Sequence, residues 1–168
     1  MNDAPTSAKP FLKGYGNWVR ADSSKKLSLF DYLNILSQTE KVDAEVILTF
    51  VSFLWPEFQV VEGRVFLREE FSQERYDHTL KYRDSQPFEY LMNQVPLSSM
   101  FPSLSFEAQK FLGETVVACW TAKLKLEFPN KEFVVFCTDE DDEPEDLWCG
   151  FYLKPSGERT DSLASEAT

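Results

Sequence analysis

The sequence is poor in the residues and motifs that usually mark catalytic and metal sites. Its 168 residues include one histidine, His78, three cysteines and six glycines. A single histidine excludes a metal site built from several histidines. The chain has no P-loop, no G-x-G-x-x-G and no G-x-S-x-G pattern, so nucleotide binding and hydrolase chemistry lack their usual sequence support. The sequence therefore predicts no cofactor, no metal and no catalytic residue.

Long hydrophobic runs are also missing. The longest apolar segment, residues 46–55, is interrupted by Thr49 and Ser52 and is too short to span a bilayer. The N-terminal residues, MNDAPTSAKPF, show no basic segment followed by an apolar stretch, so no secretory signal is predicted. Without export, an odd and loosely spaced set of three cysteines is typical of reduced thiols. These features predict a cytoplasmic protein with no membrane partner.

Positive charge is scarce as well. The chain has 28 acidic and 17 basic residues, which gives a net charge of −11. A field of this sign repels phosphate backbones, so direct binding to nucleic acid is disfavoured. It favours a basic protein partner, or it serves solubility alone.

The chain is rich in hydrophobic and aromatic residues that can form a core. It is 43% hydrophobic and contains fifteen Phe and four Trp. Aromatic side chains bury large areas, and a chain of this length fits one domain. Composition therefore predicts a globular domain.

Caps and apolar spacing predict several helices. They span residues 28–38, 43–55, 72–82, a segment opened by Pro87, and a long helix from about Ser105. Ser28 and Asp31 fit a capping box, in which each side chain bonds the other residue's backbone. In the long helix Gly113 costs about 1 kcal/mol relative to Ala, which is understandable if another element approaches closely there.

Two hairpins complete the predicted fold. One spans residues 58–69 with a turn at Glu62-Gly63, and the other joins strands 131–138 and 147–153. The order helix, helix, hairpin, helices, hairpin predicts an α+β domain with a small, mostly antiparallel sheet packed against several helices. We assign residues 27–154 to this single domain, residues 1–26 to a flexible N-terminal arm and residues 155–168 to a disordered tail.

The most distinctive motif is CTDEDDEPEDLWCGF, residues 137–151. Seven carboxylates crowd its centre: Asp139, Glu140, Asp141, Asp142, Glu143, Glu145 and Asp146. An EF-hand loop is excluded, since Pro144 stands where Gly is needed and Gly150 where a bidentate Glu is needed. Two main interpretations stay open, a solvated turn of about eight residues and a site for a basic partner, with a loose, low-affinity calcium site as a lesser alternative.

Aromatic residues and cysteines flank the acidic stretch. Strand alternation places Trp148 and Tyr152 on one face, where they can supply apolar contacts to a partner. Cys137 and Cys149 lie opposite each other if the strands pair around Glu143. We expect two small buried residues there, because acidic neighbours raise the pKa of a thiol and disfavour redox chemistry.

The sequence thus favours a binding or regulatory module over an enzyme. The predicted partner is a basic protein surface, bound by the seven carboxylates together with Trp148 and Tyr152. One alternative is an immunity-type or nucleic-acid-mimic inhibitor of a basic nuclease. Another is an enzyme with a metal-free carboxylate pocket, in which Glu57, Glu69 or Glu70 lies beside His78.

Overall fold

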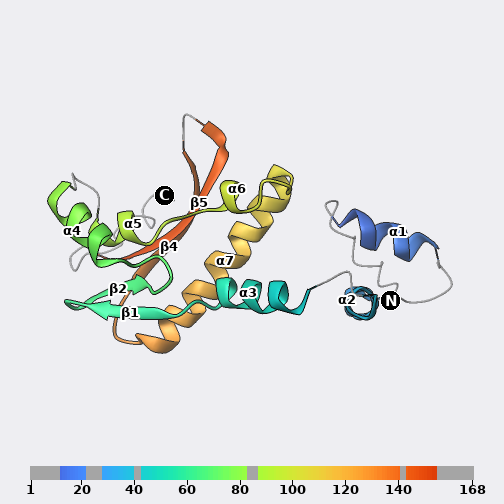
Figure 1. Cartoon of the computed structure of the whole chain (residues 1–168), viewed down its shortest axis with the longest axis horizontal. Helices are drawn as coiled ribbons and strands as arrows, with labels where there is room; N and C mark the ends of the chain where they lie inside the picture. The colour runs from blue at the N-terminus through green and yellow to red at the C-terminus, as the bar shows by residue number, and fades with distance from the viewer. Residues whose placement is uncertain (1–11, 22–27, 40–42, 83–86, 141–142, 155–168) are drawn as a thin grey trace, which may run out of the picture.

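The computed structural model of the chain describes residues 12–21, 28–39, 43–82, 87–140 and 143–154. The helices are α1 (Lys13–Ala21), α2 (Leu29–Gln38), α3 (Ala44–Leu54), α4 (Gln73–Tyr82), α5 (Phe88–Met92), α6 (Leu97–Met100) and α7 (Phe106–Glu127). The strands are β1 (Phe58–Val61), β2 (Arg64–Leu67), β3 (Val95–Pro96), β4 (Phe133–Glu140) and β5 (Glu143–Leu153). The α+β class is confirmed (Figure 1). Predictions for residues 1–11, 22–27 and 155–168 lie outside the described residues.

Local capping explains where α2 and α3 begin and end. The Ser28 hydroxyl accepts the Asp31 N–H at 3.1 Å, and the Asp31 carboxylate accepts the Ser28 N–H at 2.8 Å. The hydrogen bond from the Ser28 backbone lowers the pKa of Asp31, because it favours the ionised form. Asp43 caps α3 and Trp55 ends it before Pro56. The predicted capping box and both helices are confirmed.

Helix α1 lies within the segment that the sequence suggested to be a loose arm. It packs on α2 through aromatic rings, with Tyr15 and Trp18 centred 5.7 and 5.4 Å from Tyr32. Figure 1 shows this helix pair to one side of the rest, beyond the N-terminal end of α3. In KGYGNWVRA the residues Tyr15, Trp18 and Val19 do have helical spacing, but two glycines within nine residues disfavour a helix locally.

The two predicted hairpins belong to two separate antiparallel sheets. Strands β1 and β2 form one, and their turn places Glu62 and Gly63 at φ 51° and 80°, as a type I′ turn requires. The other sheet has the order β3-β5-β4, so β4 is an edge strand within the part of the chain that the structure describes.

The core lies between α7 and the three-stranded sheet. Alternate residues of β5, Leu147, Cys149 and Phe151, are buried in the same cluster as Trp120 of α7. On the opposite face of β5 the ring of Tyr90, from α5, stacks on Phe136 at 4.8 Å. Helices therefore cover both faces of this sheet. No helix among the described residues is long and apolar enough to cross a membrane.

One buried side chain joins the two sheets. Asn93 accepts the Leu67 N–H of β2 at 3.0 Å, and its amide donates to Val65 at 3.0 Å and to Phe151 of β5 at 3.3 Å. Asn93 is fully buried, so these hydrogen bonds satisfy backbone groups that have no access to water.

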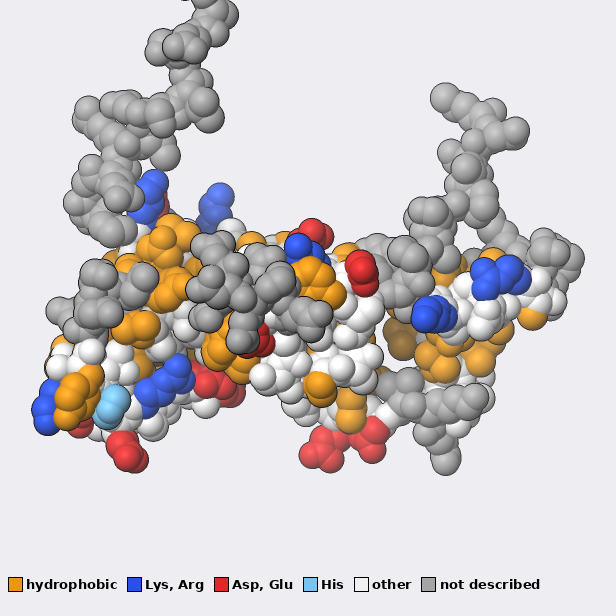
Figure 2. Space-filling view, turned by 90° about the horizontal axis from the view of Figure 1, so that it is seen from above, with side chains coloured by type: hydrophobic (Ala, Val, Ile, Leu, Met, Phe, Trp, Pro, Cys, Tyr) orange, Lys and Arg blue, Asp and Glu red, His pale blue; other side chains and the backbone are white. Residues whose placement is uncertain are grey.

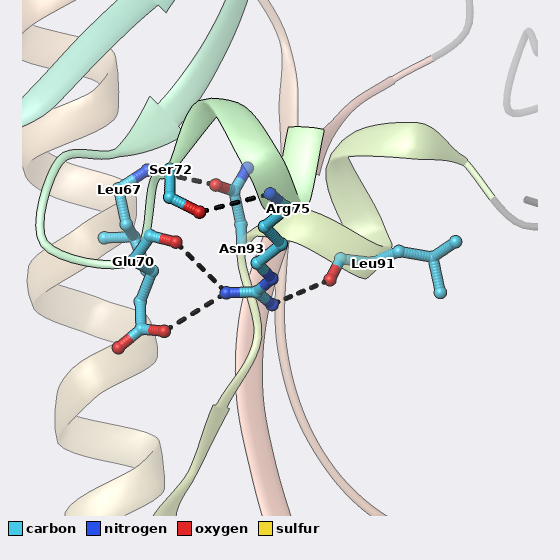
Figure 3. Close-up of polar contacts among 6 residues, drawn as sticks. All are labelled: Leu67, Glu70, Ser72, Arg75, Leu91 and Asn93. Atoms are coloured by element: carbon cyan, nitrogen blue, oxygen red, sulfur yellow. Dashed lines mark hydrogen bonds and ion pairs between the residues drawn. The ribbon is translucent and has the colours of Figure 1, made fainter. Parts of the chain in front are cut away.

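Arg75 of α4 fixes the adjoining loop. Figure 3 shows its guanidinium between the backbone and carboxylate oxygens of Glu70 and the carbonyl of Leu91, at 3.1, 3.2 and 3.0 Å. Ser72 accepts the Arg75 N–H at 3.2 Å, which confirms it as the cap of α4. These contacts hold α4 against the loop that follows β2 and against the C-terminal turn of α5.

Candidate functional site

The acidic stretch lies mostly in strands, which corrects one prediction. A turn of about eight residues was expected, yet β4 continues to Glu140 and β5 already begins at Glu143. Asp141 and Asp142 lie outside the described residues. Pairing explains the difference, because the strands keep their ladder beyond the hydrophobic part of each sequence. Figure 1 shows the hairpin of β4 and β5 extending past the remainder of the fold.

The ladder of β4 and β5 reaches into the acidic segment. Glu140 pairs with Glu143, and the register shifts between Asp139 and Glu140. The backbone pairing thus brings acidic residues of both strands to the same end of the hairpin.

A polar chain anchors the hairpin where the acidic segment ends. The Leu147 N–H donates to the Ser98 hydroxyl at 2.9 Å, and that hydroxyl donates to the side-chain amide oxygen of Gln109 at 3.1 Å. Gln109, buried in α7, donates in turn to the backbone oxygen of Phe101 at 3.1 Å. The start of the buried part of β5, which we call the base of the hairpin, is therefore held to α6 and α7.

The two aromatic residues of the predicted site are half-buried on one face of β5, with Trp148 just after the acidic segment and Tyr152 further along the strand, opposite Val134. Tyr152 packs beside Tyr90 and Phe136, with ring centres 6.0 and 6.2 Å away. Trp148 lies opposite Pro96 of β3, and its indole N–H is buried without a hydrogen-bond partner among the described residues. Both rings keep part of their surface accessible.

The predicted opposition of the two hairpin cysteines is confirmed, but only Cys149 is fully buried, while Cys137 is half-buried. Cys137 and Cys149 are direct partners in the register of β4 and β5. Cys149 is fully buried, and a hydrogen bond with Cys137 together with burial raises the pKa of its thiol. Cys119 packs against the core from α7. The arrangement fits structural thiols.

The residues of the alternative enzyme site are not brought together. Glu69 and Glu70 line a groove of about 210 Å³, but neither Glu57 nor His78 lines it. Glu57 forms an ion pair with Arg68, and His78 stacks on Tyr82 of the same helix with ring centres 4.7 Å apart. Among the described residues no group of three or more His, Cys, Asp or Glu could hold a metal ion.

The structure shows a surface that the sequence analysis missed. Helices α2 and α3 bury none of their residues, although both are rich in large apolar side chains. The largest exposures include Phe30 at 82%, Val46 at 64% and Leu48 at 67%. Figure 2 shows hydrophobic side chains also gathered on the α1–α2 part, at the right of the view, beside Lys and Arg side chains.

A signal for this surface was present in the sequence. In AEVILTFVSFL the apolar residues occupy more than one helical face, so a single neighbour cannot cover them. The rest of the fold contacts the C-terminal half of α3, where the Phe50 ring packs on Phe101 and the Phe53 carbonyl accepts the Trp120 indole N–H at 3.0 Å.

Comparison with known proteins gave no match. No protein-family model fits the sequence, and no curated protein or solved structure is significantly similar to it.

Proposed function

We propose that this protein is a protein-binding module that engages a basic protein surface through the acidic hairpin of β4 and β5. The observation that carries the proposal is the pairing of Glu140 with Glu143 at the end of a hairpin whose base is fixed. The seven carboxylates between Asp139 and Asp146 carry one sign of charge, and lysine or arginine side chains that approach them are attracted.

Each part of the hairpin has a distinct role in this proposal. The carboxylates speed association with a positively charged surface and suppress binding to acidic ones. Trp148, half-buried beside them, and Tyr152, half-buried further along the same face of β5, contribute apolar contact area, which supplies most of the affinity in a protein interface. The outer edge of β4 offers backbone groups that a partner strand can also pair with.

The test is a capture experiment with two variants of equal charge. In the hairpin variant Asp139, Asp141, Asp142 and Asp146 become Asn; in the control Glu74, Asp77, Glu107 and Glu114, exposed on α4 and α7, become Gln or Asn. Partners from the source cell are identified by mass spectrometry, and their affinity is then measured with purified proteins at two salt concentrations.

The proposal expects a basic partner that binds the wild type and the control variant but not the hairpin variant. Its affinity for the wild type should fall as salt rises, because exposed charge pairs are screened. Equal binding to all three proteins, or equal loss in both variants, contradicts the proposal.

A further inference from the structure

A second surface, distinct from the hairpin, runs along α3. Two adjoining grooves flank this helix, with volumes of about 530 and 210 Å³. Both are lined by Thr49, Phe53 and Met100, so they form one trough, which we call the α3 trough. Its larger part is further lined by Val46, Phe50 and Phe101.

The apolar lining of the trough is exposed in this structure. Val46, Phe50 and Met100 are 64%, 36% and 45% exposed. Contiguous apolar surface of this kind marks an interaction site in soluble proteins. The aromatic rings of Phe50, Phe53 and Phe101 pack on one another at 5.7 to 6.0 Å, so the floor of the trough is preformed.

None of the described residues fills the trough. Figure 1 places α2 beyond the N-terminal end of α3 and not alongside it. Among the described helices, α2 therefore does not occupy the trough.

The charge around the trough specifies the occupant. Asp43 and Glu45 line one end, and Glu69 and Glu70 line the other. Asp43 also caps α3, and Glu70 is paired with Arg75, which leaves Glu45 and Glu69 as the carboxylates least committed to other roles. No Lys or Arg lines either groove in the described part of the chain. An apolar floor with acidic ends is complementary to an apolar segment with basic ends.

The length of the trough fits a short helix. Helix α3 has 11 residues, and at 1.5 Å per residue it extends about 16 Å. A partner helix of about three turns covers this distance and presents apolar residues at positions i, i+3 or i+4, and i+7 on one face. A second copy of this chain fits less well, since each copy carries a net charge of −11.

We infer that the α3 trough binds an amphipathic helix of a partner protein, with apolar side chains on its floor and Lys or Arg side chains at Glu45 and Glu69. This site is independent of the acidic hairpin. The hairpin variant described above should therefore bind the same amphipathic helix as the wild type does, with an unchanged dissociation rate.

The test uses a fluorescein-labelled peptide of about 14 residues, with leucines on one helical face and lysines at both ends, and the full-length protein. A peptide of the same composition with shuffled leucines controls for charge, and one with glutamates at its ends controls for hydrophobicity. Fluorescence anisotropy gives the affinities. We expect saturable binding of the first peptide only.

Two variants on the same helix localise the binding. Val46→Asp puts a charge in the trough, whereas Leu48→Asp puts it at a similarly exposed position, 67% against 64%, that lines neither groove. We expect Val46→Asp to weaken binding at least about tenfold, because a buried charge without a partner is costly, and Leu48→Asp to change it little. Circular dichroism checks that both variants fold.

Charge reversal provides an independent variant set. The double variant Glu45→Lys, Glu69→Lys should weaken binding of the basic peptide at low salt and strengthen binding of the peptide with glutamate ends. Equal effects of Val46→Asp and Leu48→Asp, or binding of the shuffled peptide, overturn the inference. So does sedimentation showing a wild-type dimer that Val46→Asp makes monomeric, since the occupant is then a second copy.

Discussion

Gly113 of α7 lies directly against Cys137 of β4. A Cβ atom built at Gly113 would approach the Cys137 sulfur more closely than real Cβ atoms approach any neighbour. The glycine thus lets the longest helix lie close to the edge strand of the hairpin. This confirms the expectation that another element comes close to the helix at this residue.

This contact predicts an unusual response to Gly113→Ala. At most helix positions the change stabilises by about 1 kcal/mol. Here we expect the free energy of unfolding to fall by about 1–3 kcal/mol, because the added methyl overpacks the interface. Urea denaturation of Gly113→Ala measures the loss.

A double-mutant cycle identifies its cause. In a Cys137→Ala background the sulfur is gone, so Gly113→Ala should cost much less or should stabilise. Glu114→Ala, at the next and exposed position, controls for general effects on the helix. If Gly113→Ala costs the same in both backgrounds, the Cys137 contact is not what requires glycine.

Asn93 should be important for stability out of proportion to its size. Asn93→Ala leaves the Leu67 N–H and the carbonyls of Val65 and Phe151 without their buried partner. Each unsatisfied group costs about 1–3 kcal/mol, so we expect a large drop in the free energy of unfolding. Gln94→Ala, at the adjacent half-buried position, is the control in the same chemical denaturation series. Similar losses for both variants contradict the role assigned to Asn93.

The anchor of the acidic hairpin can be tested by amide exchange. Ser98→Ala removes the hydroxyl that accepts the Leu147 N–H at 2.9 Å. We expect faster hydrogen exchange at Leu147 while the amides of β1 and β2 keep their protection, because the opening is local. Ser99→Ala, exposed at the next position, should leave the exchange of Leu147 unchanged. Unchanged exchange in Ser98→Ala shows that other contacts fix the base.

Stability should fall at alkaline pH because of Cys149. Its thiol has a raised pKa in the folded protein, owing to Cys137 and burial, whereas in the unfolded chain it ionises near pH 8.5. Above about pH 8.5 the unfolded chain loses a proton that the folded protein keeps, so stability present below that pH is lost as the pH rises. At pH 9.5 this amounts to about 1.4 kcal/mol.

Urea denaturation at neutral and alkaline pH checks the Cys149 prediction. Cys149→Ala should be less stable at neutral pH and should show a smaller decrease between the two pH values than the wild type. Cys119→Ala controls for the remaining thiols. An equal decrease in Cys149→Ala and the wild type indicates that other groups cause the pH dependence.

The sequence by itself determined the local elements of this protein. Ser28 with Asp31 predicts the start of α2, Glu62-Gly63 predicts the hairpin turn between β1 and β2, and Ser105 predicts the start of α7. The predictions are correct because capping and turn geometry depend on residues only a few positions apart. The opposition of Cys137 and Cys149 also followed from spacing alone.

Only the tertiary structure decided which surfaces are covered. The hydrophobic pattern of α3 predicts that the helix packs on another element, but not that the described part of the fold buries none of its residues fully. Likewise the acidic residues read as a loop, because charge disfavours strands locally while pairing between β4 and β5 extends both strands. Burial and strand pairing depend on contacts between distant segments, which no local pattern of residues specifies.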